Sequence, residues 1–271
     1  MHKIIVCMTI LVASVTSAFC GEPDKVLHEK CLYPTVMIMN ENPKGVGTGV
    51  IVKIIKKKDL YENYVFTCAH VMIPVPVPEA PPEATPPPAD VAPSVTPTNL
   101  VVKPAKEKYE INIRVGIYEN WSTLVGYKNY PAEVLFVDRD KDIGLVRFES
   151  QSENSVAELD KELKLYIGND VLKVGCGLNE PFRIDSGKIT SISRSIGNMI
   201  KDTYRVSSPT IMGDSGGPVY HENKLIGLSQ AVRNAHASSP FPVSVAVPHM
   251  AYVLPVRRFY DCEKIMEYLK D

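Results

Sequence analysis

Short apolar segments separated by turn-forming residues run through most of this chain. They lie at residues 35–39, 45–52, 61–67, 111–117, 132–137, 143–148, 203–207, 224–231 and 243–247. Segments of this length, without helical patterns between most of them, favour a β-sandwich or β-barrel over alternating strands and helices. The glycines at 45–52 are not followed by Gly-Lys-(Ser/Thr), so tight packing at a barrel corner explains them better than a phosphate loop. The sequence therefore predicts an all-β fold.

One segment cannot belong to a sheet. Residues 74–104 contain eleven of the 22 prolines. Proline has no backbone N–H to donate and holds φ near −65°, so this stretch is expected to leave the body of the domain as an extended excursion. It is either a passive loop or a lid or docking arm beside a neighbouring site.

The hexapeptide GDSGGP at residues 213–218 carries the strongest chemical signal. It places Ser215 in a glycine-dense turn, where a hydroxyl and converging backbone N–H groups provide a nucleophile and a hole for an oxyanion. A bare Gly-x-Ser-x-Gly would suggest the strand-to-helix elbow of α/β-hydrolases, but a strand-like run follows here. The hexapeptide resembles the nucleophile motif of the trypsin/chymotrypsin-like serine proteases.

A serine nucleophile of this kind needs a histidine base. His70 ends the apolar run YVFTCAH and resembles the strand-then-Ala-His segment of that family. An imidazole satisfied locally in the core is the alternative interpretation of one such histidine, and the downstream serine motif favours the catalytic one. The remaining histidines lie in the leader or lack this context: His2, His28, His221, His236 and His249.

The orienting acid is expected between base and nucleophile, in the chain order of the family. Asp142 opens the apolar run IGLVRF and resembles the family's Asp-(Ile/Leu)-(Ala/Gly)-Leu pattern, whereas Asp138 and Asp140 alternate with basic residues in a solvated turn. Asp142 is therefore predicted to accept the Nδ1–H of His70 and to stabilise its imidazolium, with Asp138 as the second choice.

The resemblance covers roughly residues 31–270 apart from the proline-rich segment, and residues 170–193 resemble the paired strands of the HtrA-like branch. It implies two six-stranded antiparallel β-barrels of the chymotrypsin type. The first is expected at about 31–150 and the second at about 165–255. Apolar residues at helical spacing predict a short C-terminal helix over 261–270.

The resemblance also implies binding roles for residues around the nucleophile. The N–H groups of Gly213 and Ser215 are the expected oxyanion donors. Pro209 stands where trypsin-like members place an aspartate for basic side chains, and no negative charge follows before Gly213, which predicts a small or apolar preference. The other substrate-binding candidates are Thr210, Ile211, Met212, Gln230, Ala231 and Val232.

Activation is expected to differ from that of many digestive members, in which a cleaved N-terminus, typically Ile-Val-Gly-Gly, pairs with the aspartate before the serine. Asp214 is present, but no such site precedes Thr35. We therefore predict no zymogen switch of that kind, so Asp214 either has another partner or faces solvent.

Residues 1–20 have the basic start, short apolar run and small residues of an export signal, with cleavage after Ala18 or Cys20. Phe19 argues against lipoprotein processing at Cys20. A secreted or periplasmic protein without stable membrane insertion is expected, and export would permit a Cys31–Cys262 disulfide. No Cys-x-x-C or Cys/His cluster suggests a metal, and no PDZ-like domain is expected after residue 250.

These observations predict one domain over residues 21–271 that is a serine endopeptidase acting on a protein or peptide substrate. It would use Ser215, His70 and Asp142 through an acyl-enzyme, with no cofactor. The net charge of −1 gives no reason to expect nucleic acid. Two alternatives remain open, a catalytically inactive protease-like binding protein and a serine esterase on the same scaffold.

Overall fold

The fold is described from a computed structural model that covers residues 24–41, 44–75, 108–162, 164–193, 202–237 and 243–270, with the backbone alone at 231–237 and 243–250. The predicted leader and most of the proline-rich segment lie outside the described residues. Within those residues, no helix combines the length and apolar character needed to cross a bilayer.

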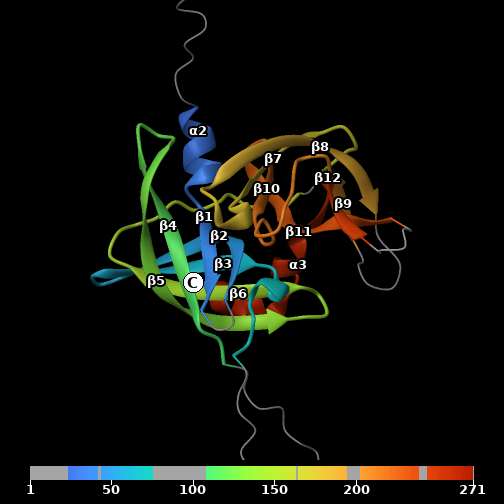
Figure 1. Cartoon of the computed structure of the whole chain (residues 1–271). Helices are drawn as coiled ribbons and strands as arrows, with labels where there is room; N and C mark the ends of the chain where they lie inside the picture. The colour runs from blue at the N-terminus through green and yellow to red at the C-terminus, as the bar shows by residue number, and fades with distance from the viewer. Residues whose placement is uncertain are drawn as a thin grey trace, which may run out of the picture.

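The first barrel closes from six antiparallel strands in the order β1-β2-β3-β6-β5-β4 (Figure 1). Their bounds are Thr35–Asn40, Gly45–Lys57, Leu60–Thr67, Ile111–Glu119, Thr123–Asp138 and Ile143–Ser150 for β1 to β6. Register shifts in the long strands β2 and β5 let each bend around a corner of the barrel. Side chains from every strand but β5 are buried inside, among them Ile38, Val50, Val65, Ile113 and Leu145.

The second barrel repeats this plan in the order β10-β11-β12-β9-β8-β7, which confirms the predicted all-β fold of two six-stranded barrels. Its strands β7 to β12 span Asp170–Gly175, Arg183–Ser193, Thr203–Val206, Pro218–His221, Lys224–Ala237 and Val243–Pro255. Val171, Ile189, Val206, Val219 and Ile226 fill its separate core.

Short helices flank the barrels. α2 (Lys25–Leu27) and the π-helical turn η1 (His28–Leu32) precede β1, and no sequence pattern predicted either of them. The C-terminal helical segment is present as α3 (Arg257–Tyr260) and α4 (Glu263–Leu269). The ring of Phe259 stacks on Phe66 of β3 with centroids 4.4 Å apart, so the end of the chain packs against the first barrel.

A single apolar cluster joins the two halves. It includes Val65 and Phe66 from the first barrel, Tyr220 and Leu254 from the second, and Ile265 from α4. The cysteines of the described residues, Cys31, Cys68, Cys176 and Cys262, are buried free thiols. The structure therefore does not contain the Cys31–Cys262 disulfide that export would permit.

Candidate active site

His70 lies in a short turn that is anchored on both sides. β3 ends at Thr67, and the 3-10 turn η2 (Ala69–Val71) follows Cys68. Cys68 and Ala69 are fully buried, whereas 47% of the His70 side chain is exposed. Asn40 of β1 donates to the Val71 carbonyl at 2.8 Å and holds the far end of the turn. The backbone is thus fixed while the imidazole remains accessible.

Asp142 meets this histidine from the turn between β5 and β6. Its φ of 55° lies in the left-handed region, which aspartate tolerates better than most residues. The carboxylate accepts from the His70 backbone N–H at 2.9 Å, and its Oδ2 lies 2.9 Å from His70 Nδ1. Asp138 instead accepts from the Lys141 N–H within the same turn. The structure therefore brings Asp142, and not Asp138, to His70.

The electrostatics of Asp142 keep it ionised. Burial alone would raise the pKa of its carboxyl, but hydrogen bonds and charge from His70, with a further hydrogen bond from Gln230, outweigh burial and lower the pKa below its ordinary value. A carboxylate that remains charged can hold the imidazole in one tautomer and stabilise it when protonated.

This lowered pKa predicts an acid-dependent loss of stability. Because the folded pKa lies below the unfolded value of about 3.9, the contribution of Asp142 is complete above that pH and disappears as the pH falls through the folded pKa. Urea unfolding should therefore show wild type losing its advantage over Asp142→Asn below about pH 4. An advantage that stayed constant down to about pH 2 would contradict the assignment.

Ser215 lies in a loop that both barrels hold. Thr48 of β2 donates its N–H to the Ser215 carbonyl and its hydroxyl to the Gly213 carbonyl, each at 2.8 Å, and Gly216 donates to the Ser229 carbonyl of β11 at 2.7 Å. Gly216 has a φ of 82°, and a Cβ there would lie 2.1 Å from the Thr48 carbonyl oxygen. This position therefore requires glycine, as the motif supplies.

Two backbone N–H groups of this loop are free to bind an anion. Within the described residues, neither the Gly213 nor the Ser215 N–H donates to an acceptor. The Met212 carbonyl accepts from Leu178 N–H at 2.7 Å. Since a trans peptide directs its carbonyl and its N–H to opposite sides, the Gly213 N–H points away from Leu178. These are the donors that the sequence predicts for an oxyanion.

Gln230 joins the acid to the nucleophile. Its side-chain amide donates to Asp142 Oδ2 at 2.9 Å, and its backbone carbonyl accepts from the Ser215 hydroxyl at 3.1 Å. The sequence pointed to Gln230 only as part of a substrate-pairing strand and missed this contact with Asp142. A polar residue within the apolar run of β11 was the one signal, since a buried amide needs a partner.

Loss of this amide should slow turnover while substrate binding is kept. Gln230→Met retains the length of the side chain and the backbone carbonyl but removes a hydrogen bond to a carboxylate, for which about 1.5–3 kcal/mol is typical. We expect kcat to fall about 10- to 100-fold, with KM changed far less. Steady-state kinetics on a peptide substrate checks this, and an unchanged kcat would show that Asp142 needs no second donor.

The other predicted binding residues differ in their exposure to solvent. Thr210 is 2% exposed and donates to the Ser208 carbonyl, whereas Met212 is 79% exposed. Ile211 lies against Gly177. A Cβ added at Gly177 would come within 2.3 Å of the Cγ1 atom of Ile211. Pro209 is half-buried. Ala231 and Val232 belong to β11, and their side chains lie outside the described part of the structure.

Comparison with known proteins places this chain in a family. Residues 47–228, more than half of the chain, match the family model for the trypsin-like peptidase domain. The chain belongs to the trypsin-like peptidase family. No curated protein matches the sequence of this peptidase.

Solved structures of HtrA-type proteases share the fold of this trypsin-like peptidase. The HtrA-type protease AlgW with tripeptide is 14% identical with a TM-score of 0.59, and the match covers 91% of this chain and 64% of that chain. Deg5 is 13% identical with a TM-score of 0.57, and the match covers 87% of this chain and 89% of that chain. The peptidase thus spans somewhat less than two thirds of the AlgW chain.

One group of metal-ligating atoms occurs within the described residues of the peptidase. The candidate atoms of Cys68, His70 and Asp142 lie within 4.8 Å of one another. Burial raises the pKa of the Cys68 thiol well above its ordinary value, and the thiol donates to the Ser229 carbonyl at 3.6 Å. A protonated thiol beside a His–Asp pair that is already hydrogen-bonded does not form a prepared cation site.

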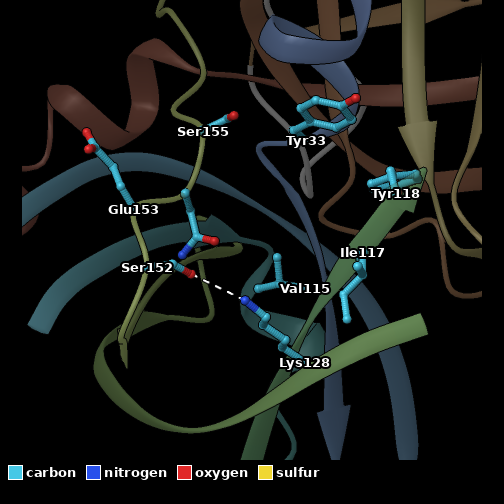
Figure 2. Close-up of a pocket in the computed structure, with 10 residues that line it drawn as sticks. Tyr33, Val115, Ile117, Tyr118, Lys128, Ser152, Glu153 and Ser155 are labelled. Carbon is cyan, nitrogen blue, oxygen red and sulfur yellow. Dashed lines mark hydrogen bonds between the residues drawn. The ribbon is translucent and has the colours of Figure 1, made fainter. Parts of the chain in front are cut away.

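A separate pocket of about 300 Å³ lies on the first barrel of the peptidase (Figure 2). Tyr33 and Tyr118 stack at 5.2 Å on one side, and Lys128 donates to Ser152 on the other. The pocket has none of His70, Asp142 or Ser215 in its lining. It is therefore distinct from the candidate active site.

Proposed function

We propose that this protein is a serine endopeptidase that cleaves peptide bonds through Ser215, His70 and Asp142. The observation that carries the proposal is one connected set of hydrogen bonds. Asp142 holds His70 Nδ1 at 2.9 Å, and Gln230 bonds both Asp142 and the Ser215 hydroxyl. Family membership supports a protease, and the site supports the serine mechanism within it.

The proposed chemistry uses these residues in turn. The Ser215 hydroxyl turns from the Gln230 carbonyl to Nε2 of His70, which takes its proton as the oxygen attacks the substrate carbonyl. The developing oxyanion lies between the N–H groups of Gly213 and Ser215. His70 then donates the proton to the leaving amine, and a water repeats the sequence to release the acyl group. This route needs no cofactor.

The substrate we propose is a protein or peptide with a small or apolar residue before the cleaved bond. The absence of acidic side chains from 209 to 213 supports this preference. We also propose that the enzyme acts after export, on the strength of the leader-like residues 1–20. Cleavage profiling on a peptide library tests the preference, and dominant cutting after Arg or Lys would contradict it.

Labelling with a fluorophosphonate tests the reaction class. Wild type should be labelled and should hydrolyse peptides, and Ser215→Ala should do neither. Peptide binding without labelling would instead favour a protease-like binding protein. Turnover of esters but not of peptides would favour a serine esterase.

A further inference from the structure

The residue before the nucleophile carries a buried charge. Asp214 is 0% exposed and lies between the two residues whose N–H groups are free. Its Oδ2 lies 2.6 Å from Lys173 Nζ and 2.5 Å from Arg183 Nη2. Asp214 therefore has internal partners, which is one of the two outcomes that the sequence left open. A buried carboxylate remains charged only when such partners compensate for lost water.

Both cations come from the hairpin of β7 and β8. Lys173 faces Asp185 across this hairpin, and its side chain is 0% exposed. Arg183 pairs in register with Gly175. A Cβ at Gly175 would lie 2.4 Å from Asp214 Oδ1, so glycine leaves the space that the carboxylate occupies.

The same carboxylate closes the turn that orients the anion-binding N–H groups. Asp214 Oδ2 accepts from the Ile211 N–H at 2.9 Å, and the Asp214 N–H donates to the Ile211 carbonyl at 3.1 Å. The turn from 211 to 214 includes the peptide that directs the Gly213 N–H. Moving the Asp214 side chain would therefore move one of the two free donors.

We propose that Lys173, assisted by Arg183, is a positioning residue that holds the oxyanion loop in its competent form without cleavage of the chain. The inference rests on the proposed function. Where many family members use the ammonium group of a new N-terminus, this chain uses a lysine side chain already in place. Among the described residues just ahead of β1, Cys31 and Leu32 are packed in the core.

Lys173→Met tests the proposal, and Lys188→Met is the matched control. Both substitutions remove a lysine from a Lys–Asp pair in the same hairpin, but Lys188 pairs with Asp170 at the surface and its side chain is 59% exposed. Lys173→Met should lower kcat by about 10²-fold, as loss of one oxyanion donor does, with KM within about 3-fold of wild type. Lys188→Met should leave both unchanged.

The affinity of a peptide aldehyde distinguishes loss of oxyanion binding from a loss of packing around residue 173. The aldehyde adds to Ser215 and places an oxyanion in the hole, so its affinity should fall in parallel with kcat. A non-covalent peptide with a C-terminal amide places no charge there, so it should bind Lys173→Met as it binds wild type. Mass analysis of fluorophosphonate-labelled wild type should show an N-terminus ahead of Asp24. A label found only on chains beginning near residue 35 would overturn the proposal.

A second variant tests the proposal in case Lys173→Met does not fold. Lys173→Met/Asp214→Asn removes both charges of the Lys173–Asp214 pair, a change that folded proteins often accept. It should fold and still show the reduced kcat, since no carboxylate ties the turn to the hairpin. If either variant is folded and has the kcat of wild type, the proposed role of Lys173 is overturned while the proposed function stands. An inert, unlabelled wild type would instead overturn the proposed function.

Discussion

Ser215→Ala is expected to lower kcat by about 10⁶-fold while leaving the fold intact. The side chain is partly buried, and within the described residues its hydroxyl donates only to the Gln230 carbonyl. The loop is held through the Ser215 and Gly213 carbonyls and the Gly216 N–H, none of which the substitution alters. Alanine removes only the oxygen that we propose attacks the substrate.

Residual activity separates the parts of the site. The free N–H groups of Gly213 and Ser215 remain in Ser215→Ala, so hydrolysis above the uncatalysed rate should persist. Peptide kinetics at high enzyme concentration measures this remaining activity, and the melting temperature controls for folding. Retention of more than about 1% of wild-type kcat would show that another group is the nucleophile.

The second large effect is expected for Asp142→Asn, which should reduce kcat by about 10⁴-fold near neutral pH. The substituted amide can still accept the His70 backbone N–H through its oxygen. Its NH₂ group would then face Nδ1, where only an acceptor holds the tautomer that leaves Nε2 free for the serine proton. The stabilisation of the imidazolium by a full charge is lost as well.

Asp138→Asn is the control for this substitution. Asp138 lies in the same turn, with the Lys141 N–H and ammonium as its partners. Its replacement should leave kcat within about 2-fold, because surface ion pairs contribute little. Equal losses in the two variants would mean that the integrity of the turn, and not the carboxylate at 142, matters.

The barrels could be predicted because their signals are local. Alternating apolar residues and turn residues mark each strand, and the segment at 143–148 appears as β6, Ile143–Ser150. The polar half of β5 was missed, since residues 123–131 show no buried face in the sequence and form a strand through pairing with β4. The π-helical turn at His28–Leu32 carries no pattern that distinguishes it from a loop.

The site residues also fall into two groups, those that a local motif predicts and those that it does not. Short motifs identify Ser215, His70 and Asp142 as candidates because each motif lies within a few neighbouring residues. Gln230 and Lys173 act through partners far away in the chain, Asp142 and Asp214. The Gln230 contact depends on how the two closed barrels meet, and the Lys173 contact depends on how the second barrel closes. No local pattern in a single sequence encodes either.

The stacking of Phe259 on Phe66 has a consequence for folding during synthesis, because the two rings are far apart in the chain. Phe66 belongs to the strand that delivers His70, and its fully buried ring is covered by a residue made almost two hundred positions later. A nascent chain that has emerged only through the first barrel would leave this ring open to water. The first barrel should therefore be complete, and the proposed site competent, only after the region around residue 260 has left the ribosome.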